Sequence, residues 1–225
     1  MIRNQAWNRF RTGSMLATAF VLCATACAGP GLHPGRIGKR AEPLEPLAEK
    51  LLPVDRLAGS LWLRQHVTVR WSGGEEAFDA VLQKREGRLL LLGLGPMNTP
   101  GFRLELGREG VVFENRSGRP MPFQPEHILA DVQRVFYPWI DGPDCSGCVR
   151  RARRSGLDVV ERIGDRHLEE RRFRDSAHPD RGEIVIRYET WRKGESVPTR
   201  VNLHNAWYGY ALEIETLASE TLDRP

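Results

Sequence analysis

The residues of this 225-residue chain whose type and spacing most directly suggest chemistry are its cysteines. Cys145 and Cys148 stand in "DGPDCSGCVR", and a C-x-x-C motif can be a redox pair, half of a zinc site or a short-loop disulfide. Zinc takes about four ligands, and the chain has neither a second cysteine pair nor a closely spaced histidine pair. Pro143 and Gly147 indicate a loop, whereas a thioredoxin-like site would open a helix. We therefore predict a disulfide and no metal site, with a redox pair and free thiols as the alternatives.

A third cysteine, Cys27, follows a segment typical of export. Residues 1–26 begin with three arginines and continue with the short apolar run "MLATAFVLCATA", the order and length of a secretory signal. The run ends in "ATAC", which resembles a lipobox, the pattern whose cysteine becomes the acylated first residue of a lipoprotein. The resemblance implies lipidation of Cys27. Ala28, in place of Asp, implies anchoring to the outer membrane on its periplasmic face. The alternative is ordinary cleavage near Ala26, with Cys27 incidental.

The charge of the chain argues against a nucleic-acid partner. Loss of the three signal arginines takes the formal net charge from +4 to +1, and nucleic-acid binding needs a concentrated basic face. The nearest candidate is "VRRARR", residues 149–154, whose arginines could meet lipid phosphates or simply aid solubility. The following stretch mixes both signs, so we predict solvated strand faces for Glu161, Arg162, Asp165, Arg166, Glu169, Glu170, Arg171 and Arg172.

Catalytic motifs are missing from the sequence. It contains no G-x-S-x-G, no H-E-x-x-H and no G-x-x-x-x-G-K-[ST]. Beyond the predicted tether, the histidines are scattered singly at positions 66, 127, 167, 178 and 204, which is more typical of surface or strand residues than of bases or ligands. We predict that the protein is not an enzyme and needs no cofactor.

The elements that would position a binding site are mostly strands. Residues 27–54 are rich in Pro and Gly and are predicted to be a tether, and residues 55–225 suffice for a single domain. In "WLRQHVTVRW", Val67, Val69 and Trp71 share one parity and charged or polar residues take the other. Similar runs joined by short glycine turns predict an antiparallel meander with one packed face.

One segment, "PEHILADVQRVFYPW", has helical spacing instead. Ile128, Val132 and Phe136 recur on one stripe, Pro125 suits the first turn, and Pro138 ends the helix. A single amphipathic helix within a meander most simply covers the concave side of the sheet. We therefore predict an α+β fold: a curved antiparallel β-sheet forming an incomplete barrel, with the helix plugging its concave side.

Three stretches of the chain resemble known families. "FDAVLQKREGRLLLLGLGPMNTPGFRLEL" with "PEHILADVQRVFYPW" resembles the DUF3261 family of short bacterial lipoproteins, often encoded beside aryl-polyene or other acyl-chain biosynthesis genes. The C-terminal "VPTRVNLHNAWYGYALEIETLAS" resembles the closing strand pair of the LolB-type outer-membrane lipoprotein receptor. The resemblance implies a half-barrel that binds an acyl or polyene lipid, or a lipoprotein's acyl chains, and passes it to the outer membrane. A periplasmic carrier protein would be a possible partner. A scaffold for envelope enzymes without cargo, and an enzyme acting on the same lipid, are the alternatives.

The same resemblance suggests the functional residues. In the LolB-type receptor a loop between two strands carries a protruding apolar residue that helps to deliver acyl chains, and Met97, after Gly95 and Pro96, falls at the matching place. The alternative is that Met97 folds back onto the core. The inward parity of the strands and the helix stripe would form either a ligand cavity or a dry core. The predicted cavity residues are Val67, Val69, Trp71, Phe78, Leu90, Leu92, Phe102, Leu104, Ile128, Val132, Phe136, Tyr188 and Leu212.

Overall fold

The computed structural model describes residues 50–118, 121, 123–191 and 197–222, all within one compact unit, Leu47–Pro225. The predicted signal segment, the predicted lipidation site Cys27 and nearly all of the predicted tether lie outside the described residues.

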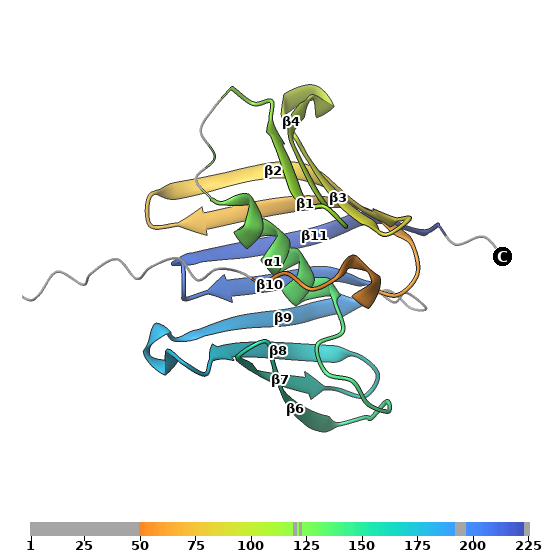
Figure 1. The fold of residues 1–225 in the computed structure, drawn as a ribbon, viewed down its shortest axis with the longest axis vertical. Coiled ribbons are helices and arrows are strands. Elements are labelled where there is room, and N and C mark those ends of the chain that lie inside the picture. The colour runs from red at the N-terminus through yellow and green to blue at the C-terminus, as the bar shows by residue number, and fades with distance from the viewer. Residues whose placement is uncertain (1–49, 119–120, 122, 192–196, 223–225) are drawn as a thin grey trace, which may run out of the picture. The chain divides into compact units, whose positions relative to one another are not determined.

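Eleven strands form one antiparallel sheet (Figure 1). In sheet order they are β5-β4-β3-β2-β1-β11-β10-β9-β8-β7-β6. The outermost strands β5 and β6 are not paired with each other in the described part of the chain, so the curved sheet stays open. The strands are β1 (Leu61–Trp71), β2 (Gly74–Arg85), β3 (Arg88–Leu94), β4 (Pro100–Gly107), β5 (Gly110–Asn115), β6 (Cys148–Arg154), β7 (Leu157–Ile163), β8 (Leu168–Asp175), β9 (Glu183–Trp191), β10 (Pro198–Asn205) and β11 (Tyr210–Thr221), and short 3-10 turns lie at η1 (Val54–Arg56), η2 (Pro96–Asn98) and η3 (Pro179–Arg181).

Hairpin turns and one long-range pairing organise this sheet. Between β2 and β3, Glu86 and Gly87 both have positive φ (52° and 70°), as a two-residue type I′ turn requires. The first and last strands pair at the centre of the sheet, from Leu61 opposite Thr221 to Trp71 opposite Tyr210. Two meanders, β1–β5 and β6–β11, are thereby joined into one sheet.

The only α-helix among the described residues, α1 (Pro125–Phe136), connects these two meanders in sequence. Proline occupies its first turn, where the missing N–H is not needed. In Figure 1 the helix lies across the face of the sheet, in front of β1, β11 and β10. Its apolar residues Leu129 and Val135 are buried in the same core cluster as the inward residues of the strands. The predicted helix and the open, curved antiparallel sheet are both present.

Polar side chains from the sheet hold the C-terminal end of α1. The last carbonyls of a helix have no partner within it and carry partial negative charge. Arg171 on β8 donates to the carbonyl of Arg134, and the Tyr188 hydroxyl on β9 donates to the carbonyl of Val135 at 2.9 Å. Arg171 is also paired with Glu161 on β7, with 2.7 Å between Nη2 and Oε1. The helix is therefore fixed by directed bonds as well as by apolar contact.

This arrangement corrects one prediction. Eight charged residues between positions 161 and 172 were expected to face solvent; five of them do, but Glu161, Glu170 and Arg171 are only 4, 8 and 5% exposed. Glu161 and Arg171 are paired with each other inside the protein, which is how a charged side chain can be buried without a large desolvation cost, whereas Glu170 is paired with the more exposed Arg172 and Arg187.

The segment before the first strand also contacts the helix. The Leu52 N–H donates to Gln133 Oε1 at 2.7 Å, and Gln133 Nε2 donates to the Leu52 carbonyl at 2.8 Å. Leu51, Leu52 and Val54 pack with the core. The packed domain thus includes residues just before the predicted boundary at Asp55.

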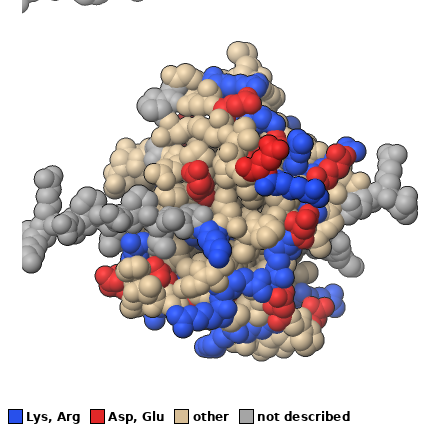
Figure 2. Space-filling view, in the orientation of Figure 1, with Lys and Arg blue, Asp and Glu red and all other residues tan. Residues whose placement is uncertain are grey.

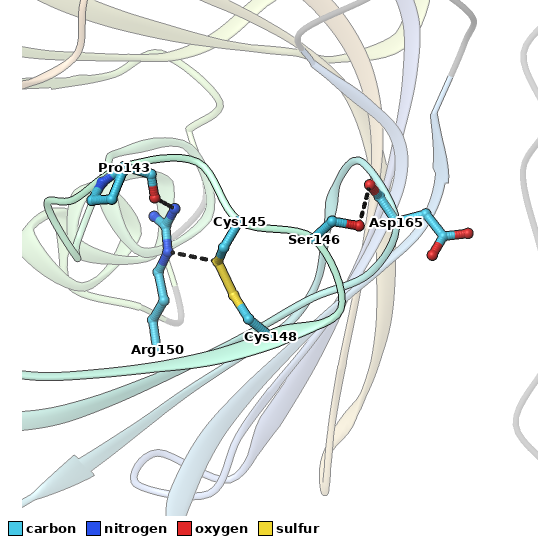
Figure 3. The surroundings of a disulfide bond; sticks show 6 residues. All are labelled: Pro143, Cys145, Ser146, Cys148, Arg150 and Asp165. Carbon is cyan, nitrogen blue, oxygen red and sulfur yellow. Dashed lines mark hydrogen bonds between the residues drawn. A yellow bond between two sulfur atoms is a disulfide. The ribbon is translucent and has the colours of Figure 1, made fainter.

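Cys145 and Cys148 form a disulfide at the start of edge strand β6, with Cα atoms 6.1 Å apart (Figure 3). Arg150 crosses the loop, with Nε 3.3 Å from Cys145 Sγ and Nη2 donating to the Pro143 carbonyl. Of the alternatives drawn from the sequence, the disulfide is the one present, and it closes the loop that leads from α1 into β6.

Candidate functional site

A cavity of about 740 Å³ lies between the inner face of the sheet and α1. Its volume falls within the range of roughly 300–1,000 Å³ that is usual for ligand pockets. Strands β1, β2, β3, β4 and β11, the loop between β3 and β4, and one side of α1 contribute to its wall, which is mainly apolar. Predicted cavity residues that line it are Val67, Val69, Trp71, Phe78, Phe102, Ile128, Val132, Phe136 and Leu212.

The other four predicted residues lie elsewhere. Leu90 and Leu92 are on the opposite face of β3, because the inward residues of that strand include Leu91, which does line the cavity. Leu104 points inward but is fully buried in the core cluster. Tyr188 is buried beside α1, where its hydroxyl bonds the helix end. The choice of Leu90 and Leu92 was wrong because a run of four leucines has no alternation from which to choose a face.

The exposure of the wall residues distinguishes a mouth from a closed end. The wall includes the exposed residues Glu75, Glu76 and Arg116, and these mark the mouth. Along β1 the inward residues Trp71, Val69, Val67 and Gln65 line the cavity in turn, and Gln65 is only 3% exposed. At about 3.3 Å per strand residue, the lined stretch of β1 spans roughly 20 Å. The cavity is therefore a long apolar slot, open at one end.

Aromatic rings gather near the mouth. The rings of Trp71 and Phe123 meet edge to face at 5.9 Å, and Phe123 lies 5.0 Å from the ring of Tyr210. Phe123 and Tyr210 also line the cavity, although neither is among the predicted cavity residues. Their wide, rigid apolar surfaces suit contact with a flat or extended ligand.

A buried polar network beneath Tyr210 joins the sheet to α1. The Tyr210 hydroxyl donates to Asp131 and accepts from Asn205 Nδ2 at 3.1 Å. Asp131 also accepts from Arg134 Nη1 at 2.8 Å, and the Arg134 guanidinium lies 5.1 Å from the centre of the Trp207 ring. Burial, reinforced by the neighbouring carboxylate, raises the pKa of Tyr210, so its hydroxyl stays protonated. Asp131 and Arg134 have the (i, i+3) spacing of a helical ion pair, but nothing in the sequence showed that the pair would be buried.

The loop between β3 and β4 projects one apolar side chain into solvent. Met97 is 92% exposed and has φ 57°, a left-handed conformation that non-glycine residues rarely adopt. The loop is closed by the Gly95 N–H donating to the Thr99 carbonyl at 2.7 Å and by Thr99 Oγ1 donating to the Pro96 carbonyl at 2.8 Å. Gly95, Pro96 and Thr99 line the cavity. Met97 therefore stands outside the mouth, and it does not fold back onto the core.

Gly93, just before this loop, makes room for an aromatic ring. A Cβ atom at Gly93 would lie 2.0 Å from Cε1 of Phe102, which is far inside van der Waals contact. The Phe102 ring meets that of Phe78 edge to face at 5.9 Å. The absent side chain of Gly93 thus lets the Phe102 ring lie against the sheet, where it forms part of the cavity wall.

Charge on the outside is mixed. Figure 2 shows basic and acidic side chains lying side by side on the viewed face. On β6, Arg153 lies 3.7 Å from Asp158, and Arg154 lies 2.6 Å from Asp141. Within the described residues no group of three or more His, Cys, Asp or Glu side chains is placed to hold a metal ion. None of the described helices has the length and apolar character needed to cross a membrane.

Comparison with protein families gives a clear assignment. The model of a family described as "Protein of unknown function (DUF3261)" matches residues 62–218, well over half of the chain. The chain belongs to the DUF3261 family. A search of curated proteins finds no match.

Solved structures resemble this DUF3261 protein more distantly. A LolA superfamily protein from Nitrosomonas europaea is 13% identical with a TM-score of 0.45, covering 76% of this chain and 93% of its own. A domain described as an outer-membrane lipoprotein-sorting protein domain from Vibrio parahaemolyticus is 10% identical with a TM-score of 0.42, covering 74% of this chain and 87% of its own. A DUF1329 family protein from Desulfovibrio piger is 11% identical with a TM-score of 0.40, covering 75% of this chain and 89% of its own. At these scores the likenesses carry no argument about function, which has to come from the cavity itself.

Proposed function

We propose that this protein is an outer-membrane lipoprotein that binds a hydrophobic ligand in the cavity and passes it to the membrane. The ligand would be an acyl or polyene lipid, or the acyl chains of a lipoprotein handed over by a periplasmic carrier protein. The observation that carries the proposal is the open-ended, mainly apolar cavity of about 740 Å³. Water in such a slot makes few hydrogen bonds, so the binding of an apolar chain that displaces this water is favourable.

In this proposal α1 plugs the concave side of the half-barrel and forms one wall of the binding site. Ile128, Val132 and Phe136 on α1 face the slot. Transfer would require no nucleotide or covalent step, because moving an apolar chain from one apolar environment to another is close to neutral in free energy. The polar groups at the helix, Asp131 and Arg134, are bonded to each other and serve to fix α1. We therefore assign them a structural role and propose that the protein is not an enzyme.

The exposed loop supplies a route to the membrane. Met97 is flexible, apolar and polarizable, properties that suit contact with an irregular lipid surface. It stands beside residues of the cavity wall, so a chain leaving the slot would pass next to it. We assign the loop of Gly95, Pro96 and Met97 to delivery, with the Cys27 lipid keeping the protein at the outer membrane.

Ligand binding is tested with a version that lacks the anchor, Cys27→Ser, secreted in the native host. The gently purified protein is extracted with organic solvent and the extract is analysed by mass spectrometry. A variant carrying Trp71→Gln and Phe136→Gln places polar groups in the slot, and the matched control carries Leu90→Gln and Leu92→Gln on the outer face. A stoichiometric lipid in wild type and control, but not in the slot variant, supports the proposal. An empty protein that also fails to take up a fluorescent fatty acid would overturn it in favour of a scaffold without cargo.

Delivery is tested separately with Met97→Glu. Val112, 49% exposed on β5, provides the matched control Val112→Glu, which adds the same charge at an exposed apolar position. We expect Met97→Glu to retain ligand and fold normally but to release a fluorescent fatty acid into phospholipid vesicles more slowly, while Val112→Glu behaves as wild type. Equal release rates from all three proteins would remove the loop from the mechanism.

A further inference from the structure

The residue Gln65, at the closed end of the slot, is polar although the wall around it is mainly apolar. Gln65 points inward from β1, is 3% exposed and lines the cavity. Its side chain makes one hydrogen bond, from Nε2 to Thr216 Oγ1 on β11 at 3.3 Å. Thr216 is also buried, at 3% exposed. An amide has two N–H donors and an oxygen with two lone pairs, so within the described chain the oxygen and the second N–H of Gln65 have no protein partner.

The amide oxygen of Gln65 is not sealed from solvent but open to the cavity, so a ligand that displaces water there has to replace the hydrogen bonds that the amide loses. The neighbouring residues across the sheet do not explain why position 65 is a glutamine. Gln65 is opposite Ala80 on β2 and Thr216 on β11, and Ile214 follows on the inward face of β11. An apolar residue at position 65 would continue the wall formed by Val67 and Val69. The slot therefore ends in an amide, which is held by the Thr216 hydroxyl behind it and which a purely apolar chain would not need.

The chemistry of this end favours an uncharged partner. Gln65 and Thr216 are neutral. The buried acid of the cavity wall, Asp131, is already matched by Arg134, and the charged wall residues Glu75, Glu76 and Arg116 lie at the mouth. A neutral hydroxyl or carbonyl of a ligand can form a hydrogen bond with the Gln65 amide. A charged ligand group would be buried there without a counter-ion, which is strongly disfavoured.

We propose that the ligand is a long apolar molecule carrying a neutral hydrogen-bonding group, a hydroxyl or a carbonyl, at the end that enters first, and that Gln65 binds this group. The inference rests on the proposed lipid-binding function and narrows its ligand class. Gln65 acts as a specificity-determining residue: it discriminates between a chain with a polar tip and the same chain without one. The charged groups at the mouth then meet the other end of the molecule.

The test compares two ligands that differ only at the tip, hexadecanoic acid and ω-hydroxyhexadecanoic acid, by displacement of a fluorescent fatty acid from the Cys27→Ser protein. Wild type is expected to bind the hydroxylated acid roughly tenfold more tightly, the effect of one buried hydrogen bond to an otherwise unsatisfied group. Gln65→Met, which keeps the length of the side chain without its polar atoms, is expected to abolish or reverse this preference. Gln83→Met, on the outer face of β2, is the matched control and should keep it.

The outcomes separate the inference from the proposed function. If wild type binds both acids equally well, the inference is overturned and the lipid-binding function stands. If neither acid nor the fluorescent fatty acid binds, both are overturned. The comparison of the two acids on wild type needs no variant, so it remains decisive even if Gln65→Met fails to fold.

Discussion

The attachment of α1 to the sheet through Arg171 makes a quantitative prediction. Replacing Arg171 by Met removes the guanidinium that bonds both Glu161 and the carbonyl of Arg134. The Glu161 carboxylate, 4% exposed, is then left buried without its counter-ion. Breaking a buried ion pair from one side costs about 3–5 kcal/mol, and loss of a cation at a helix C-terminus adds about 0.5 kcal/mol. We expect the free energy of unfolding of Arg171→Met to fall by about 4 kcal/mol.

The partner substitution should cost less. In Glu161→Gln the amide oxygen can still accept from Arg171, and the guanidinium keeps its bond to the helix carbonyl, so we expect a loss of about 1–2 kcal/mol. The double variant Arg171→Met, Glu161→Leu leaves no buried charge and should be more stable than Arg171→Met alone, since a buried pair can be replaced by apolar residues at little cost.

Urea unfolding of the Cys27→Ser protein, followed by tryptophan fluorescence and far-ultraviolet circular dichroism, measures these differences. The two signals should change together if the domain unfolds in one step. Because Arg171 also holds the wall of the slot in place, its loss should weaken fatty-acid binding as well. The reasoning is refuted if Arg171→Met unfolds within about 1 kcal/mol of wild type, or if the double variant is less stable than Arg171→Met.

Three further predictions concern the slot, the helix contact and the loop. Gly93→Ala should lower the free energy of unfolding by about 1–3 kcal/mol, because the new Cβ would displace the Phe102 ring; unchanged urea stability and fatty-acid uptake would show that the ring yields freely. Burial raises the pKa of Tyr188 from 10.0 to about 12, so its contribution to stability is complete below pH 10 and is lost as the pH rises toward 12. Stability measured across this range should therefore fall less steeply in Tyr188→Phe, and an identical slope would contradict the assignment. Joint replacement of Cys145 and Cys148 by Ser should cost at most about 2 kcal/mol in urea unfolding, since the loop is short, and should leave fatty-acid binding unchanged because neither residue lines the slot.

Periodicity in the sequence predicts much of this fold. The alternation in "WLRQHVTVRW" identifies the inward side of β1, and the apolar stripe with Pro125 at its start identifies α1. Where alternation is missing, the prediction fails: the side chains at positions 89–92 are all leucine, and only pairing with β2 determines that Leu91 and not Leu92 faces inward. The register of a strand is determined by its pairing with a neighbouring strand, so the composition of one strand alone does not predict which of its side chains face inward.

Buried polar residues were the second feature that the sequence did not predict. Gln65 alternates correctly with Val67 on the inward side of β1 but was not placed in the site, because a glutamine in a strand is usually exposed. Arg171 and Glu161 were expected in solvent for the same reason. Their burial depends on partners brought together from β7, β8 and α1, so it becomes visible only when the tertiary structure is known.

The pairing of β1 with β11 also determines when this protein can fold. Gln65 and Thr216, which bond each other across these strands, are 151 residues apart in sequence. Strands β1–β5 can form early, as neighbours in a meander, but β1 has only one of its two neighbours until nearly the whole chain is available. Contacts between distant residues slow folding, and unpaired strand edges favour aggregation in the interval. A chain that is made from its N-terminus onward therefore exposes an incomplete slot to its surroundings until its last strand is available. Deleting β11 should be more harmful than an internal deletion of the edge strand β6, although both remove one strand of the same sheet.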